Sequence, residues 1–336
     1  MNFHHTSLES LHFPVMLKEV LKVCEPENGG IFLDCTFGGG GYSKAILRYP
    51  NTNVLALDRD KFALEESKKV KKKYSNRFFF YNEKFSNLSK VLKNKKIDNI
   101  IFDLGISSFQ LADMSRGFSF KAKESIDMNM GLSSLSAEDV INTYEEESLK
   151  LIIKILGEEI EASKIVKNII KARKEKRISK VSELVDIIEK SKKKNFKKKI
   201  NVCTKTFQAL RIFVNKEISE LIEGIIGATR TIKPGGKIII VTFHSIEDKI
   251  VKFYFNQYSK NKSKPSRYIP ESTEDDIIFF EDRNNFIKPS EEEIIINPRS
   301  RSAKLRYAIR NDKKFTETQD LKNKFKKYIE LESLNG

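Results

Sequence analysis

The sequence predicts an α/β fold, a doubly wound parallel sheet interrupted by an inserted helical domain. Up to about residue 104, short apolar runs alternate with helical patterns, which is typical of βαβ units. A cluster of glycines stands where the first of these runs gives way to a helix. Between about 113 and 205 the strand-like runs stop, and only helical spacing of apolar residues remains.

The elements follow from these patterns in chain order. Buried strands are expected at 31–36, 53–58, 78–81 and 98–104, with helices at 42–49, about 60–73 and near 86–93. Helical spacing then covers 136–173 and 179–194, and a basic tract occupies 190–199. The α/β pattern resumes with a long helix at about 207–231, a tight turn at 233–236, a strand at 237–243, a helix near 246–258, a polar stretch around 260–293 and a last strand near 305–310. The expected domains are a core formed by 1–112 and 206–336, and an inserted helical substrate-recognition domain at 113–205.

Composition excludes several classes of protein. The 336 residues suit two domains, and the net charge of +16 favours a polyanionic partner, although a Lys-rich composition also fits an AT-rich coding genome. No apolar run is long enough to span a membrane, and the first residues do not form a secretion signal. Cys24, Cys35 and Cys203 are scattered and make no zinc pattern, so we expect a cytoplasmic protein without a metal.

The glycine loop DCTFGGGG (34–41) is the first candidate site. Glycines let the backbone approach a ligand closely, and the following helix start offers amide donors. The spacing does not meet the dinucleotide fingerprint, because no glycine stands at 43 or 44, and no Gly-Lys-Ser/Thr follows. Taken alone, the loop is equally compatible with a simple turn.

Three acidic residues strengthen the site. Asp34, Asp58 and Asp103 stand at the ends of the first, second and fourth predicted strands, and the carboxyl ends of parallel strands meet at one ligand-binding edge. Asp58 is placed to accept hydrogen bonds from ribose hydroxyls. Each of the three can instead cap a turn or a helix. Without a pyrophosphate signature, and with an acidic site suited to a sulfonium, S-adenosyl-L-methionine fits better than NAD.

Several segments then form an ordered series. They are HFPVMLKEV (12–20), DCTFGGGGYS (34–43), ALDRD (56–60), DLGISSFQL (103–111), RGFSF (116–120), FQALRIFVNKE (207–217), KPGGKIIIVTFHSIEDKIVK (233–252) and NPRSRSAKLR (297–306). Together they resemble the MraW family of small-subunit ribosomal RNA methyltransferases over about residues 12–310.

This resemblance implies a class I (Rossmann-like) methyltransferase that transfers a methyl group from S-adenosyl-L-methionine to the N(4) amino group of a cytidine in the decoding region of 16S rRNA. It places the cofactor at Gly40, Gly41, Tyr42, Asp58, Phe85, Asp103 and Gln110. The chain departs from the family at Cys35, where glycine is usual, at Tyr42, where histidine is usual, and at Asn129, where arginine is usual.

The chemistry requires alignment of donor and acceptor, together with an oxygen that accepts an N–H bond of the cytosine amino group. Asp103 is the first candidate for this catalytic role and Asp127 the second. The acceptor pocket can involve Ser107, Ser108 and Phe109. His244 can act as a base, contact RNA or simply pack, and no strong base is required.

Contacts to RNA are expected from Arg116, Arg211, Arg299 and Arg301, which stand in the family motifs and can meet phosphates. Arg211 can instead be an internal ion-pair partner. The small ribosomal subunit is the expected partner, and a homodimer is compatible with the sequence. Three alternatives stay open: an NAD or nucleotide-sugar enzyme on a similar sheet, a non-catalytic RNA-binding protein on a degenerate methyltransferase fold, and a methyltransferase that acts on a different RNA.

Overall fold

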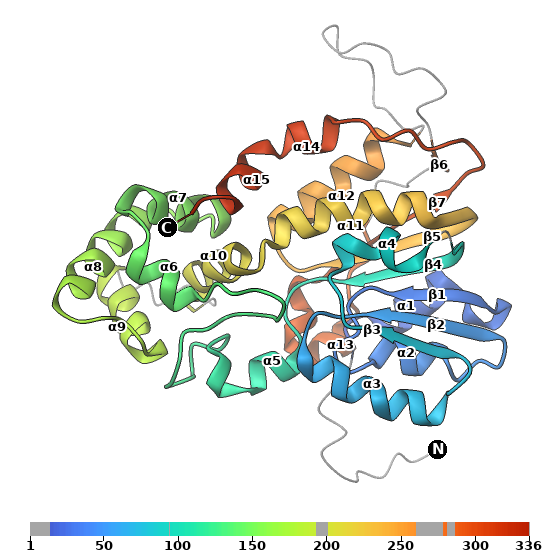
Figure 1. The fold of residues 1–336 in the computed structure, drawn as a ribbon, viewed down its shortest axis with the longest axis horizontal. Coiled ribbons are helices and arrows are strands. Elements are labelled where there is room, and N and C mark those ends of the chain that lie inside the picture. The colour runs from blue at the N-terminus through green and yellow to red at the C-terminus, as the bar shows by residue number, and fades with distance from the viewer. Residues whose placement is uncertain (1–13, 94, 193–200, 260–277, 281–285, 336) are drawn as a thin grey trace, which may run out of the picture. The chain divides into compact units, whose positions relative to one another are not determined.

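A computed structural model of the chain describes residues 14–93, 95–192, 201–259, 278–280 and 286–335 (Figure 1). The described residues group into two compact units. Unit 1 comprises Met1–Gly105 and Leu221–Leu321, and unit 2 comprises Ile106–Glu220 and Lys322–Gly336. The last segment of the chain therefore groups with the helical unit, whereas the sequence pattern predicted it in the core.

Unit 1 is built on a seven-stranded sheet with the order β3-β2-β1-β4-β5-β7-β6. The strands are β1 (Gly30–Asp34), β2 (Thr52–Leu57), β3 (Phe78–Tyr81), β4 (Ile97–Asp103), β5 (Ile232–Thr242), β6 (Phe279–Phe280) and β7 (Lys304–Arg310). The first five pair in parallel, while β7 is antiparallel to β5 and β6. Strand order reverses between β1 and β4, and open α/β sheets bind ligands at such a switch point. The predicted α/β, Rossmann-like fold class is confirmed.

Helices cover both faces of this sheet (Figure 1). One face carries α1 (Leu17–Cys24), α2 (Gly41–Ile46) and α3 (Lys61–Lys73), which share a hydrophobic core with β1, β2 and β3. The other face carries α4 (Leu88–Leu92), α12 (Ser245–Gln257) and α11 (Glu217–Thr231), which belongs to unit 1 from Leu221 onward. The unit also contains α13 (Glu291–Ile296) and the 3-10 turns η2 (Pro26–Asn28), η3 (Phe85–Asn87) and η6 (Pro298–Ser302). The middle parts of the central strands are apolar and buried, as residues 100–102 of β4 and 238–241 of β5 are, which fits a sheet with both faces covered.

Unit 2 is helical. Its elements are α5 (Ser108–Ala112), η4 (Met114–Arg116), α6 (Ala137–Thr143), α7 (Glu146–Leu156), α8 (Ala162–Glu175), α9 (Val181–Ser191), α10 (Thr204–Asn215) and α15 (Lys326–Glu332), while α14 (Asp320–Lys324) lies at the unit boundary. α7, α8 and α9 each bury one apolar stripe, as Leu149, Ile152, Ile153 and Leu156 do on α7, whereas α10 is buried around most of its circumference. Within the described part of the chain, none of the helices combines the length and apolar character needed to cross a bilayer.

Some predicted elements differ in extent. The helical spacing at 136–173 covers three separate helices, and the single helix expected at 207–231 is interrupted at Lys216, where φ is 51°. The turn at 233–236 lies inside β5, where the register with β4 shifts between Ile97 and Asn99. The N-terminal thirteen residues, most of the basic tract 190–199 and much of 260–293 lie outside the described residues.

Candidate active site at the carboxyl edge of the sheet

The glycine loop leaves β1 after Asp34 and enters α2 at Gly41. Gly40 has a φ of 76°, and a Cβ atom there would lie 2.7 Å from ring carbons of Phe37. A Cβ atom on Gly41 would lie 2.8 Å from Cγ of Pro14. The turn therefore requires glycine at both positions, for conformation at the first and for space at both.

Asp58 ties this loop to the end of β2. Its Oδ2 accepts a hydrogen bond of 2.7 Å from the Gly38 amide, and its Oδ1 accepts one of 2.9 Å from the Asp60 amide. Burial raises the pKa of Asp58 to about 6, against the opposing effect of these two amides. The alternative that Asp58 caps the next helix is wrong, because the Asp60 carboxylate caps α3 by accepting from the Phe62 amide.

Asp34 is fully buried and has its hydrogen bonds made inside the protein. The Ser43 hydroxyl donates to its Oδ2 at 2.7 Å, and the Thr36 amide donates to Oδ1 at 3.3 Å. Burial raises the pKa of Asp34 to about 6. Asp34 thus holds the glycine loop against α2, which is the structural role that the sequence left open for it.

Asp103 at the end of β4 is different. Its amide donates to the Thr36 hydroxyl at 2.7 Å, but its buried Oδ1 has no hydrogen-bond partner among the described residues. Burial, followed by the nearby carboxylates of Asp34 and Glu247, raises the pKa of Asp103 well above its ordinary value. A buried acceptor without a donor is costly, and it is the kind of group that a bound cation or N–H donor satisfies.

Two aromatic side chains complete the edge in unit 1. Phe85 on η3 lies edge-on to Phe102 of β4, with ring centroids 5.5 Å apart, and a Cβ atom on Gly224 of α11 would lie 2.6 Å from the Phe85 ring. Tyr42 on α2 is buried, and its hydroxyl donates to the Val15 carbonyl. Tyr42 therefore directs its side chain into the protein, where burial raises the pKa of its hydroxyl well above the ordinary value.

The remaining predicted side chains of the cofactor and acceptor sites belong to unit 2. Ser107 and Gln110 form a capping box at the start of α5, in which the Gln110 Oε1 accepts from the Ser107 amide at 2.9 Å. Asp127 is half-buried, and burial raises its pKa while the positive charge of Arg116 acts in the opposite direction. Arg116 donates to the Asn129 carbonyl at 2.7 Å. The predicted site residues Arg116 and Asp127 therefore lie in the same loop region.

Asn129 has a local role in this loop. Its amide group donates to the Ser133 carbonyl at 2.7 Å, and its Oδ1 accepts from the Gly131 amide at 2.6 Å. Asn215 of α10 holds the flanking backbone, because it accepts from the Met130 amide and donates to the Met128 carbonyl. Asn215 was missed by sequence reasoning, since nothing in its local pattern points to residues more than eighty positions away.

The predicted arginines differ in their surroundings. Arg211 makes a two-pronged ion pair with Glu217, with Nε and Nη2 at 2.8 and 2.9 Å from the carboxylate oxygens, so the ion-pair alternative is what the structure contains. Arg299 and Arg301 are exposed on η6.

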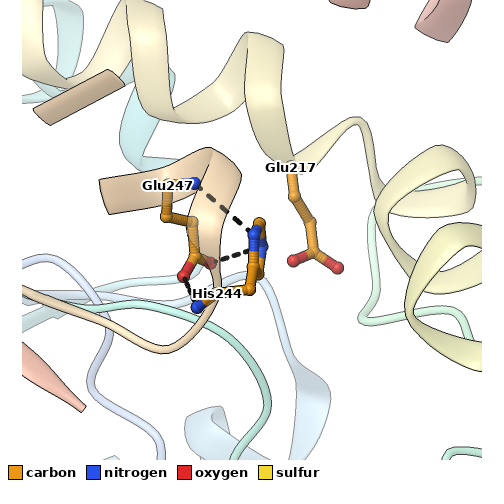
Figure 2. Close-up of side chains that lie close together, drawn as sticks. All are labelled: Glu217, His244 and Glu247. Carbon is orange, nitrogen blue, oxygen red and sulfur yellow. Dashed lines mark hydrogen bonds and ion pairs between the residues drawn. The ribbon is translucent and has the colours of Figure 1, made fainter. Parts of the chain in front are cut away.

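His244 begins α12 as its N-cap (Figure 2). Its Nδ1 accepts from the Glu247 amide at 3.4 Å, and the Glu247 carboxylate accepts from the Phe243 and His244 amides. The imidazole Nε2 lies 3.1 Å from the Glu247 carboxylate. Of the alternatives open to His244, packing at a helix start is the one that these contacts describe, and Glu217, also drawn, belongs to unit 2.

The sheet order, the glycine loop and the acidic strand ends define a Rossmann-like enzyme with a nucleoside cofactor. The model of the MraW methylase family matches residues 9–323, and the chain belongs to this family. The chain is therefore a methylase, and its methyl donor is S-adenosyl-L-methionine, as predicted. The residues at the sheet edge fit that donor. The Asp58 carboxylate can accept hydrogen bonds from hydroxyl groups, and the unpartnered Asp103 oxygen can interact with a cationic group or accept a hydrogen bond from an N–H group.

Curated relatives span nearly the whole chain. A protein of Rickettsia akari (strain Hartford) named ribosomal RNA small subunit methyltransferase H is 42% identical over 304 residues, covering 88% of this chain and 97% of that protein. The protein of the same name from Ehrlichia canis (strain Jake) is 41% identical, covering 89% of this chain and all of that protein. A solved rRNA methylase from Streptococcus thermophilus has a TM-score of 0.40 at 10% identity, covering 90% of this chain and 99% of that one.

Proposed function

We propose that the chain transfers a methyl group to the N(4) amino group of a cytidine in the decoding region of 16S rRNA. The observation that carries the proposal is the buried, unpartnered Oδ1 of Asp103, at the carboxyl end of β4. The names of the relatives support a ribosomal RNA substrate. The net charge of +16 supports a polyanionic one.

Each side chain at the sheet edge has a proposed task. Asp58 holds the ribose of the cofactor, and the backbone of Gly40, Gly41 and Tyr42 lines the cofactor site. The Phe85 ring, which packs against Phe102, forms the wall of the site next to β4. S-adenosyl-L-methionine supplies a methyl group on a sulfonium, an electrophile that needs no further activation. The protein then has to align the acceptor with the donor, and alignment contributes about 7–11 kcal/mol to rate enhancement.

Asp103 acts on the acceptor. The lone pair of the cytosine amino group is delocalised into the ring, so an oxygen that accepts one of its N–H bonds makes the nitrogen more nucleophilic. With the methyl donor bound, transfer would form the N–C bond as the donor's C–S bond breaks, while Asp103 holds the amino group and the extra proton would leave the nitrogen for solvent. Asp127 is the second candidate for this hydrogen bond, and Gln110 belongs to the proposed cofactor site.

Substrate recognition is proposed for unit 2 together with three arginines, of which Arg116 is half-buried and Arg299 and Arg301 are exposed. Arg116, Arg299 and Arg301 are the proposed phosphate contacts, and Arg211 is a weaker candidate because Glu217 already occupies its guanidinium. A cytidine within structured RNA has to be splayed out to reach a methyl donor, which requires protein surface beyond the cofactor site.

The test is transfer of labelled methyl groups to 30S subunits, naked 16S rRNA and tRNA, with nucleoside analysis of the product. N(4)-methylcytidine formed from a ribosomal substrate is the expected result. Label in another nucleoside would refute the acceptor assignment. Cofactor binding without any transfer would favour the alternative of an RNA-binding protein on a degenerate fold.

A further inference from the structure

A group of positively charged side chains surrounds one aromatic ring in unit 1, beside β7 and two strands along the sheet from Asp103. Lys304, Arg306 and Lys288 lie over the Phe286 ring, with their charged groups 4.8, 5.3 and 5.6 Å from its centroid. A fourth cation, Arg301, lines a cavity of about 190 Å³ together with Phe286, Lys288 and Lys304. We call these four cations and the ring the Phe286 cluster.

The backbone register explains why the cluster forms. Ile287 and Leu305 exchange two backbone hydrogen bonds of 2.9 and 3.0 Å as an antiparallel bridge. Side chains alternate between faces along an extended chain, so the residues on either side of this pair point to the opposite face. Phe286 and Lys288 are thereby brought together with Lys304 and Arg306 on one face.

Among the residues that the structure describes, the positive charges around the ring outnumber the negative ones. Asp248 of α12 accepts hydrogen bonds of 2.8 Å from Lys304 and Arg306, and although burial opposes them, these hydrogen bonds hold the pKa of Asp248 below its ordinary value. The single carboxylate of Asp248 is therefore shared by Lys304 and Arg306. Lys288 and Arg301 are exposed and make no hydrogen bond or ion pair with any residue that the structure describes.

A second observation marks the cluster as incomplete. Arg306 is only 4% exposed, and its Nη1 is buried without a hydrogen-bond partner among the described residues. Cations that share one ring and one carboxylate repel each other, and a bound anion relieves that repulsion. The cavity is smaller than the cavities of about 300–1,000 Å³ that hold whole drug-sized ligands, so it suits a single charged group.

We infer that the Phe286 cluster binds a backbone phosphate of the RNA substrate. This inference rests on the proposed function and adds to it a defined docking point, with Lys288 and Arg301 as the groups that meet the phosphate. The ring is already covered by cations, so stacking of a base on it is not part of the proposal. Lys304 and Arg306 supply background charge and fix the ring.

The test compares two double variants of the full chain. Lys288→Ala/Arg301→Ala removes the proposed phosphate-binding groups, and Arg48→Ala/Lys72→Ala removes the same charge from exposed positions elsewhere in unit 1. Binding of 16S rRNA and 30S subunits is measured across a salt series, and binding of S-adenosyl-L-methionine is measured by calorimetry. We expect the first variant to bind RNA about ten-fold more weakly and to keep its affinity for S-adenosyl-L-methionine. The slope of the logarithm of the RNA-binding constant against the logarithm of the salt concentration should become shallower by about 0.7 for each phosphate that the protein no longer neutralises.

The outcomes separate this inference from the proposed function. Equal weakening in both double variants would mean diffuse electrostatics and overturn the docking point. If the wild type binds RNA and Lys288→Ala/Arg301→Ala binds it equally well, the docking point fails and the proposed function stands. If the wild type binds no RNA, the proposed function fails as well. Inorganic phosphate that shifts the Arg301 side-chain NMR signal without any RNA binding would assign the cluster to free phosphate instead.

Discussion

Asp34 and Asp103 are carboxylates at the ends of adjacent strands, yet their surroundings differ. Asp34 receives hydrogen bonds from Ser43 and Thr36, whereas the Asp103 Oδ1 receives none from the described residues. Both positions could be predicted from the sequence, because each follows an apolar run. Thr36 could not, since its hydroxyl meets the Asp103 amide only once β1 and β4 are paired.

Replacement of Asp103 tests the proposed role of its carboxylate. We expect Asp103→Asn to lower kcat by about a hundred-fold or more while changing cofactor affinity much less, because the amide is a weaker acceptor of the amino N–H bond. Single-turnover methyl transfer and calorimetric cofactor binding measure the two effects. Full turnover in this variant would contradict the catalytic role. A matched change at the buried neighbour, Asp34→Asn, is expected to act mainly on stability.

The raised pKa of Asp58 leads us to expect that cofactor binding depends on pH. Burial raises its pKa to about 6, and the ionised form is the better acceptor for hydroxyl groups. Affinity for S-adenosyl-L-methionine should therefore be high above that pH and fall as the pH is lowered through it. Calorimetry between about pH 7.5 and about pH 5 measures the slope. An Asp58→Asn variant should bind weakly with little pH dependence, and an unchanged slope in that variant would assign the titration to Asp34.

At the scale of elements, apolar patterning predicted where strands and helices occur better than where they stop. The pattern continues from α10 into α11, so the sequence suggests one helix. Asn215, the last residue of α10, bonds through its side chain to backbone groups of the distant loop at Met128 and Met130, and Lys216 after it adopts a left-handed conformation. The local apolar pattern carries no signal for these long-range contacts.

The start of α11 is completed by another distant residue. Glu332 of α15 is buried, and its carboxylate accepts from the amides of Ile218 and Ser219 and from the Ser219 hydroxyl. α15 therefore caps α11 from outside. Truncation by Glu332→Ala leaves these donors buried, and we expect it to cost about 1–3 kcal/mol in denaturant unfolding, with Glu330→Ala on the exposed side as the control.

The same contact predicts a sign for the pH dependence of stability. Burial raises the pKa of Glu332 from 4.5 to about 7, so the folded protein binds more protons than the unfolded chain between these values. The contribution of Glu332 to stability is therefore greatest at low pH and declines as the pH rises to about 7. The free energy of unfolding of the wild type and of Glu332→Gln, measured at several pH values between 4.5 and about 7, tests this decline. The variant should show a smaller decline, and an identical decline in both would exclude Glu332 as its source.

At the scale of the whole molecule, an interrupted core could be predicted because the α/β alternation stops and later resumes. That residues 322–336 group with unit 2 could not, since a short amphipathic helix carries no signal for the core that it joins. We expect a chain ending at Leu321 to lose protease resistance in unit 2, because Glu332 and the other buried residues of α15 are removed. Calorimetric binding of S-adenosyl-L-methionine should persist. A truncated chain with unchanged protease resistance would contradict the grouping.

The interruption of the sheet has a consequence for how the chain is made. Strand β4 ends at Asp103, and its neighbour β5 begins at Ile232. At about 5–20 residues per second, roughly 130 further residues take on the order of ten seconds to synthesise. Throughout that interval the nascent chain carries an apolar strand with one open edge, the kind of surface that favours mispairing with other chains. Cotranslational protection of that edge is therefore a requirement that this topology places on the cell.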